Sequence, residues 1–296
     1  MEKNSFSFKI GNFKCMAVSD GIHTYEEPSS LLFPAADKVE LEGVLGKHNL
    51  QPGDWPEWKS SYTCLVVNTG QRLVLVDTGA GTILGPETGR LALNLETVGI
   101  NPGDIDTVII THAHPDHIGG STIDGEEVAF PNANFFIMKE EWDFWTSVRA
   151  EKDLSELPLE EDFRQAIISI ARDNLHAIEG QLELIDSERE IVPGIMAVLT
   201  PGHTPGHMMP VISSLEEELF CISDALVHPI HIVKPQWHMA ADLNPKQNIL
   251  TRREILNMAT EREVLIHAFH FPFPGIGQVS WDNGSWQWKP ILTVSA

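Results

Sequence analysis

The chain has 296 residues, and 42% of them are apolar, which is enough to bury a sizeable core. Its 20 basic and 42 acidic residues give a formal charge of −22, which argues against nucleic acid as a partner because the phosphate backbone is itself negative. No run of 18 apolar residues is present to span a membrane, and the N-terminus lacks the apolar core of a signal peptide. The three cysteines show no CxxC spacing, so we expect a cytoplasmic protein without disulfides.

Apolar runs and helical periodicity place the expected elements in chain order. Strands are predicted at residues 62–68, 72–76, 107–110, 134–138, 182–185, 196–199, 209–212, 219–222 and 264–267. Apolar residues recurring every three to four positions predict a helix over 162–177, and a second helix is expected over 245–259 with Asn244 as its cap. Strands followed by a helix, twice over, fit two sheets packed face to face with helices outside. No linker or repeat divides the chain, so one α/β domain over residues 1–296 is expected.

The most informative motif follows the predicted strand at 107–110. Residues 111–120 read Thr-His-Ala-His-Pro-Asp-His-Ile-Gly-Gly, which places His112, His114, Asp116 and His117 within six positions. Histidine is 13 of the 296 residues, so three histidines at this spacing would occur by chance in roughly 2% of such chains. His112 and His114 point the same way on a loop, while Asp116 and His117 turn toward a second position. The segment can therefore serve two metal ions.

Further metal-capable side chains end later apolar runs. His203 lies in the loop Pro-Gly-His-Thr-Pro-Gly-His, Asp224 follows the run that begins at Phe220, and His270 follows the run that begins at Val264. Sequence alone leaves rivals to His203 and His270, and these are His207, His228, His231, His238 and His267.

From Asp77 to His270 the chain resembles the metallo-β-lactamase superfamily, with the motifs in the same order. The resemblance implies a four-layer αβ/βα sandwich with a two-metal site. It assigns His112, His114 and His203 to one ion. It assigns Asp116, His117 and His270 to the other ion, and Asp224 bridges the two. Such a pair holds a hydroxide whose pKa is lowered to about 7, which makes it a nucleophile at neutral pH. Zinc is the default ion, although manganese, cobalt and iron suit the same ligands.

Asp77 is a candidate for holding the metal-bearing loop. It ends the predicted strand at 72–76 and is followed by Thr-Gly, so its carboxylate could fix the tautomer of a metal-binding histidine. The alternative is a simple Asx-type turn without any link to the metals.

The ligand set narrows the expected reaction. Diiron oxidoreductases of this superfamily carry a carboxylate at the position of His114, and its β-lactamases usually lack an equivalent of Asp224. The run His-Phe-Pro-Phe-Pro-Gly-Ile-Gly at 270–277 is very similar to methyl parathion hydrolase-like enzymes, which are related to quorum-quenching lactonases. The resemblance implies lactonase, arylesterase and phosphotriesterase activities on small hydrophobic esters or lactones.

Several aromatic side chains are candidates for the substrate pocket. Phe271 and Phe273 beside a metal ligand could form an apolar wall, or could be ordinary core aromatics. Trp142 and Trp145, three residues apart at an expected helix start, could line the pocket, pack in the core or contact a second subunit. The N-terminal extension, about 1–60 and including Trp55 and Trp58, is expected to form a lid or a dimer contact. The resemblance favours a homodimer.

For the mechanism we expect the hydroxide to attack the carbonyl carbon or the phosphorus, while Asp224 holds both ions and Asp116 assists proton transfer to the leaving alcohol. Related lactonases use a tyrosine in the region after His203, yet the only tyrosines here are Tyr25 and Tyr62, outside that region. Either metal polarisation carries more of the oxyanion stabilisation, or a residue such as His228 or His231 helps in the pocket. The sequence therefore favours aryl esters and aromatic lactones over homoserine lactones.

Two other functions share features of this pattern. A glyoxalase II-like thioesterase has the same seven ligands but needs basic residues for the glutathione carboxylate, and cations are sparse near the C-terminus. A non-catalytic metal-binding protein is the more distant alternative, and it would have a pocket closed to solvent.

Overall fold

Two mixed β-sheets form the centre of the computed structural model, which describes residues 4–47, 50 and 55–291. The first sheet has the order β1-β2-β3-β4-β5-β8-β9 and the second the order β10-β11-β12-β13-β14-β15-β16. The strands of the first are β1 (Ser5–Ile10), β2 (Phe13–Glu26), β3 (Glu57–Asn68), β4 (Leu73–Val76), β5 (Thr107–Ile109), β8 (Asn134–Met138) and β9 (Leu182–Ile185). Those of the second are β10 (Arg189–Val192), β11 (Ile195–Leu199), β12 (Met208–Ser214), β13 (Glu217–Cys221), β14 (Leu265–His267), β15 (Ile276–Asp282) and β16 (Ser285–Pro290).

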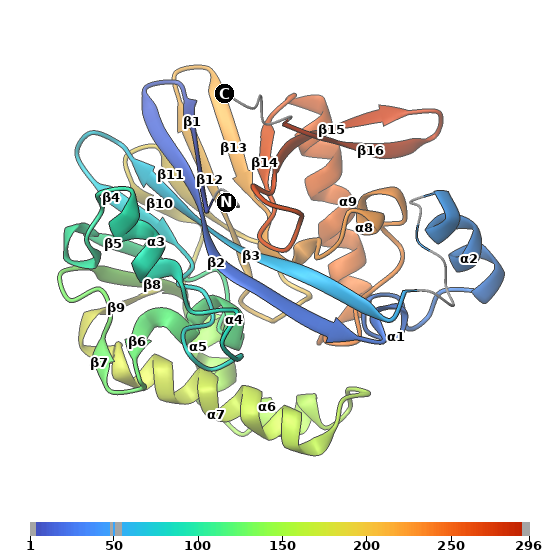
Figure 1. Cartoon of the computed structure of the whole chain (residues 1–296), viewed down its shortest axis with the longest axis horizontal. Coiled ribbons are helices and arrows are strands. Elements are labelled where there is room, and N and C mark those ends of the chain that lie inside the picture. The colour runs from blue at the N-terminus through green and yellow to red at the C-terminus, as the bar shows by residue number, and fades with distance from the viewer. Residues whose placement is uncertain (1–3, 48–49, 51–54, 292–296) are drawn as a thin grey trace.

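Helices cover the outer faces of both sheets (Figure 1). On the first sheet lie α3 (Leu91–Thr97), α5 (Lys139–Trp145), α6 (Arg149–Leu154) and α7 (Glu161–Ala177), and on the second lie α8 (Ile230–Val233) and α9 (Pro245–Glu261). Beyond the ends of β2 and β3 lie α1 (Pro28–Leu32) and α2 (Lys38–Lys47). The remaining short elements are α4 (Pro115–Ile118), β6 (Thr122–Ile123), β7 (Glu127–Val128), η1 (Pro102–Asp104), η2 (Gly119–Ser121), η3 (Glu179–Gln181) and η4 (Ser223–Ala225).

Alternating side chains of the strands build three layers of core. In β4, Val74 and Val76 pack between the two sheets, whereas Leu75 faces the helices of the first sheet. In β13, Leu219 packs between the sheets and Phe220 faces α9. Both sheets are therefore apolar on both faces and need a helical layer on each side. The predicted four-layer αβ/βα sandwich is confirmed.

The two predicted helices form close to the expected positions. α7 spans Glu161–Ala177 and buries Ile167, Ala171 and Leu175 on one side, as its periodicity requires. α9 begins after Asn244, whose side chain accepts a hydrogen bond from the backbone N–H of Gln247. Within the described part of the chain, no helix is both long and apolar enough to cross a bilayer.

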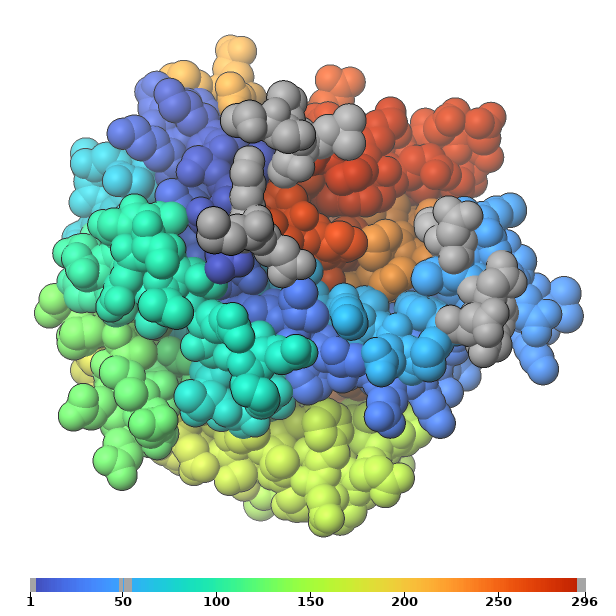
Figure 2. Space-filling view, viewed as in Figure 1, coloured from blue at the N-terminus to red at the C-terminus, as the bar shows by residue number. Residues whose placement is uncertain are grey.

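The N-terminal region is more ordered than the sequence indicated. β1 and β2, for which no strands were predicted, pair with β3 and widen the first sheet. β2 and β3 form a long antiparallel pair that crosses the molecule toward α1 (Figure 1). Their residues appear in blue across the centre of the space-filling view in Figure 2. β15 and β16, also unpredicted, extend the second sheet.

Candidate metal centre

The metal-capable side chains lie after the ends of strands from both sheets. β5 leads into the loop that carries His112 and His114, and α4 supplies Asp116 and His117 directly afterwards. In the second sheet, β11 leads to His203, β13 to Asp224 in η4, and β14 to His270. Since these strand ends meet at one edge of the sandwich, residues 158 positions apart in the chain, 112 and 270, become neighbours.

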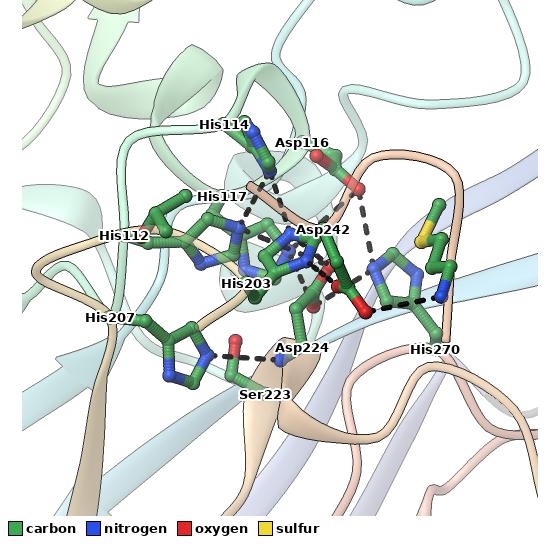
Figure 3. Close-up of polar contacts among 12 residues, drawn as sticks. His112, His114, Asp116, His117, His203, His207, Ser223, Asp224, Asp242 and His270 are labelled. Carbon is green, nitrogen blue, oxygen red and sulfur yellow. Dashed lines mark hydrogen bonds and ion pairs between the residues drawn. The ribbon is translucent and has the colours of Figure 1, made fainter. Parts of the chain in front are cut away.

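The first cluster consists of His112, His114, His203 and Asp224, with one donor atom of each within 4.8 Å of the others. His114 Nδ1 lies 3.1 Å from His112 Nε2 and 2.9 Å from His203 Nε2, and His203 Nε2 is 3.3 Å from Asp224 Oδ2 (Figure 3). Three imidazole nitrogens and a carboxylate oxygen that converge on one point are the ligand set of a tetrahedral metal site.

The second cluster consists of Asp116, His117 and His270. His270 Nε2 is 3.4 Å from Asp116 Oδ2 and 3.2 Å from Asp224 Oδ1, and His117 Nε2 is 3.1 Å from the same Asp224 oxygen. Asp224 therefore faces the first cluster with Oδ2 and the second with Oδ1, which is the orientation of a bridging carboxylate (Figure 3).

The chemistry of these donors fits two cations. His117 Nε2 and Asp224 Oδ1 are buried and make no hydrogen bond, although an unpaired buried polar atom is costly. Burial and the neighbouring histidines hold the pKa of His112 and of His114 well below the usual range, which keeps their lone pairs free. Burial raises the pKa of Asp224, but the facing His270, His117 and His203 outweigh it and leave this pKa well below the usual range. Burial lowers the pKa of His117 and of His203, but Asp224 beside both rings outweighs it and raises these two pKa values, so a bound cation would displace a proton from each of these rings.

Each cluster is supported by a second layer of hydrogen bonds. The Nδ1 of His117 lies 2.8 Å from Asp77, whose carboxylate also accepts from the backbone and hydroxyl of Thr111. Asp242 lies 2.8 Å from the Nδ1 of His203, and Ser60 Oγ lies 2.9 Å from the Nδ1 of His270. A partner on Nδ1 fixes the tautomer so that Nε2 faces the metal. Asp77 lies where the sequence placed it, whereas no local pattern marked Asp242 or Ser60.

Glu141 on α5 joins the two loops that build the first cluster. Its Oε1 accepts from Ala113 N (3.0 Å) and Trp145 Nε1 (2.7 Å), and its Oε2 accepts from Thr204 Oγ1 (2.7 Å) and Gly206 N (2.9 Å). Burial raises the pKa of this carboxyl, while the four donors oppose the shift. The loop approaches so closely that a Cβ at Gly206 would lie 2.2 Å from the backbone N of Glu141. The sequence analysis did not identify this residue.

The rival histidines have other partners. The His207 ring lies beside His112, but its Nε2 accepts from the backbone N–H of Asp224 and its Nδ1 lies 2.8 Å from Thr200 Oγ1. His238 contacts the carbonyl of Met239, and His267 is buried in β14. The structure thus brings together all seven residues of the expected ligand set.

A cavity opens beside the two clusters. Its polar wall consists of His114, Asp116, His203, Asp224 and His270. The remaining lining is mostly apolar or aromatic, and consists of His23, Tyr25, Leu31, Trp58, Leu84, Pro115, Phe163, Ile167, Val227, Met239 and Ala241. Phe163 of α7 is 46% exposed, so the cavity reaches the surface.

The six aromatic residues expected to line the pocket lie outside this lining. Phe271 is fully buried against Trp288 in the core of the second sheet, and Phe273 is half-buried and absent from the cavity lining. Trp145 is also fully buried and packs against the ring of His114 from the core side, while Trp142 packs on His176.

His228 and His231 lie under the cavity in an aromatic cluster around Phe33. His231 contacts the carbonyl of Leu32, and the His228 ring lies 5.9 Å from that of Trp58, which does line the cavity. Phe271 follows the ligand His270 in the sequence but does not line the cavity, because the chain turns into the core directly after His270.

The paired strands β2 and β3 instead supply one wall of the cavity, which was not predicted from the sequence. His23 and Tyr25 on β2 share one face with Trp58, Ser60 and Tyr62 on β3. The rings of Trp58 and Tyr62 lie 6.1 and 5.4 Å from that of His270. The every-second-residue pattern of polar and aromatic side chains at 23–25 and 58–62 was the available signal. Tyr25 and Tyr62 lie outside the region after His203 in the sequence, but strand pairing brings both to the site.

The chain is similar to known proteins in both sequence and architecture. An N-acyl homoserine lactonase from Bacillus sp is 28% identical over 206 residues, which cover 62% of this chain and 70% of that protein. The structure of AidC, described as a dizinc quorum-quenching lactonase in complex with the product N-hexanoyl-L-homoserine, has a TM-score of 0.90 at 28% identity and covers 99% of this chain and 100% of that chain. The structure of the hydrolase AbOPH has a TM-score of 0.87 at 26% identity, with full coverage of both chains.

The family model described as the metallo-beta-lactamase superfamily matches residues 58–270, which is more than half of the chain and includes all seven ligands. Together with the four-layer fold and the two ligand clusters, this match means that the chain belongs to the metallo-β-lactamase superfamily.

Proposed function

We propose that this metal-dependent hydrolase is a dizinc lactonase that opens lactones bearing an apolar acyl chain, such as N-acyl homoserine lactones. The observation that carries the proposal is the mixed lining of the cavity, which combines metal ligands with apolar residues such as Leu31, Phe163, Ile167 and Met239. A lactone ring at the metals would leave its acyl chain against the apolar wall. The similarity to N-acyl homoserine lactonases and to a dizinc lactonase supports this substrate class.

His112, His114 and His203 would hold one ion, Asp116, His117 and His270 the other, and Asp224 both. When bound, the two ions supply a hydroxide at neutral pH and polarise the ester carbonyl. Asp77, Asp242 and Ser60 hold the histidine rings in place, so that little reorganisation is needed during the reaction.

Asp116 is placed for proton transfer. Its carboxylate lines the cavity and lies 3.4 Å from His270 Nε2. After the acyl C–O bond breaks, the leaving alkoxide needs a proton, and Asp116 would take it from the hydroxyl added to the acyl carbon and pass it to that oxygen. The apolar wall excludes water from the reacting group, which strengthens each of these interactions.

Arylesterase and phosphotriesterase activities form a second candidate function. Trp58 and Phe163 in the lining offer aromatic surfaces for an aryl group, and the metal chemistry is the same for both kinds of ester. A glutathione thioester is disfavoured, because no lysine or arginine is among the described residues that line the cavity. A purely structural metal role is disfavoured because the cavity reaches the surface at Phe163.

The test is a hydrolysis panel with the zinc-loaded protein. The substrates are N-hexanoyl-homoserine lactone, dihydrocoumarin, p-nitrophenyl acetate, methyl paraoxon and S-lactoylglutathione, and the His114→Ala variant is the blank. We expect the highest kcat/KM for a lactone. A panel led by the thioester, or a blank as active as the parent protein, would refute the proposal.

Three sequence predictions remain predictions: the homodimer, the cytoplasmic location, and the N-terminal region as a lid or dimer contact. Tyr25, Leu31 and Trp58 from this region line the cavity, which supports a role for it at the substrate site. Trp55 is buried with Phe33 in the cluster under the cavity.

A further inference from the structure

Two tyrosine hydroxyls meet beside the metal centre, and neither belongs to the two ligand clusters. Tyr25 Oη and Tyr62 Oη are 2.7 Å apart, although the residues lie on different strands. The Tyr62 ring packs on the ring of the metal ligand His270, so the pair is next to the second cluster. Tyr25 lines the cavity, whereas Tyr62 is fully buried.

Counting protons orients this pair. Two hydroxyls carry two protons, and only one of them can lie between the two oxygens. Among the described residues, the Tyr62 hydroxyl has one hydrogen-bond partner, which is the hydroxyl of Tyr25. If Tyr25 donated to Tyr62, the Tyr62 proton would be buried without an acceptor, which is destabilising. The favoured arrangement has Tyr62 donating to Tyr25, which leaves the proton of Tyr25 free to point into the cavity.

The surroundings keep the Tyr25 hydroxyl in this place. Its ring stacks on Trp58 at 5.2 Å and meets the edge of His23 at 4.6 Å. A donor fixed by ring packing, beside the wall formed by Asp116 and His270, is preorganised for an oxygen that gains negative charge there.

We propose that Tyr25 is a catalytic residue that donates a hydrogen bond to the leaving oxygen of the substrate, with Tyr62 as its positioning residue. This inference rests on the proposed function. A hydroxide forms the new bond to the acyl carbon, the acyl C–O bond of the ester breaks, and its electron pair goes to the leaving oxygen. Tyr25 stabilises that oxygen without losing its proton, while Asp116 moves the proton of the added hydroxyl to it, which gives a carboxylate and an alcohol. The substrates that would depend on Tyr25 are esters and lactones whose leaving group is a basic alkoxide that does not stabilise its own negative charge.

The test compares Tyr25→Phe with Tyr62→Phe. Both variants delete the same tyrosine–tyrosine hydrogen bond and keep both rings, but Tyr25→Phe also leaves the Tyr62 proton buried without an acceptor. The dependence of the rate loss on the leaving group therefore distinguishes the lost donor from a structural effect. Only Tyr25→Phe removes the donor from the cavity. Melting temperature and zinc content, measured for both variants, check that the fold and the metals are retained.

The readout is kcat and KM on esters of graded leaving-group basicity, namely p-nitrophenyl acetate, phenyl acetate and N-hexanoyl-homoserine lactone. For Tyr25→Phe we expect kcat on the lactone to fall about 30- to 100-fold with KM within twofold, because removal of a donor to transition-state charge acts on kcat. On the p-nitrophenyl ester the loss should be below about threefold, since that leaving group stabilises its own charge. Tyr62→Phe should lose less than about fivefold on every ester.

Equal losses in the two variants, or a Tyr25→Phe loss that is the same for every leaving group, would overturn the inference. Parent protein that hydrolyses aryl esters but not lactones would refute the proposed function alone, because the aryl series still tests Tyr25. If Tyr25→Phe does not fold, 3-fluorotyrosine incorporation into Tyr62→Phe provides the second test, because Tyr25 is then the only tyrosine of the chain. The more acidic phenol should change the rate on the lactone and leave the p-nitrophenyl ester unaffected, and an unchanged lactone rate would overturn the inference.

Discussion

Glu141→Gln tests whether one buried carboxylate holds the loops of the first metal cluster together. Glu141 accepts four hydrogen bonds, two on each oxygen, from the loop of His112 and His114, from the loop of His203, and from its own helix. A glutamine amide can accept on one side only. Its NH₂ group would best face Thr204, whose hydroxyl can turn to accept, but the backbone N–H of Gly206 would then face another donor.

The expected magnitude follows from that one mismatch. A hydrogen bond from a backbone N–H to a carboxylate contributes about 1.5–3 kcal/mol, and a buried donor without a partner costs about 1–3 kcal/mol. The two effects describe the same N–H, and the neutral amide is easier to bury than the carboxylate, so we expect a loss of about 2–3 kcal/mol. If this loss of stability falls only on the two loops, it corresponds to a weakening of the first metal site by about 30- to 160-fold.

The assay has two parts. Urea unfolding of the metal-free protein, followed by tryptophan fluorescence, gives the free energy of unfolding, and competition with a chromogenic chelator gives the affinity of each metal. Glu140→Gln is the matched control, because Glu140 is the neighbouring residue, is about half exposed and pairs with Arg149 at the surface. We expect the control to change stability by less than about 0.5 kcal/mol. A Glu141→Gln variant that equals the control in both stability and zinc affinity would refute the role of Glu141 in holding the two loops together.

Four further outcomes are expected. His114→Ala should lose one tightly bound zinc and nearly all hydrolysis, as measured by elemental analysis and initial rates, and two retained ions with full activity would contradict the assignment. Asp242→Asn should weaken zinc binding about 10- to 100-fold in chelator competition, because His203 loses the carboxylate on its Nδ1. Burial lowers the pKa of His267 to about 4, whereas this histidine in the unfolded chain takes up a proton at about pH 6.5. The free energy of unfolding should therefore fall as the pH falls from about 6.5 to 4. His267→Gln should reduce that slope by about 1.4 kcal/mol per pH unit in urea titrations. Phe163→Ala should lower kcat/KM more for long than for short acyl chains, and an equal change for both would exclude Phe163 from chain recognition.

Much of the architecture was readable from local sequence. Apolar runs located most strands of both sheets, because a strand buried on both faces needs nearly continuous apolar residues. The helices α7 and α9 were predicted from periodicity and from the Asn244 cap. β2 was not predicted, because its partly exposed and polar residues become a strand only through pairing with β3.

By itself, the sequence determined the metal chemistry. His112, His114, Asp116 and His117 lie within one short segment, so their spacing alone sets their relative positions, and His203, Asp224 and His270 each follow a recognisable strand. Only the tertiary structure decided what surrounds that centre. Tyr25, Glu141 and Asp242 reach it from β2, α5 and the segment before α9, and strand register and helix packing decide which of their faces turns inward. A shift of one residue in the pairing of β2 with β3 would turn Tyr25 away from the cavity, and no local pattern in the sequence fixes that register.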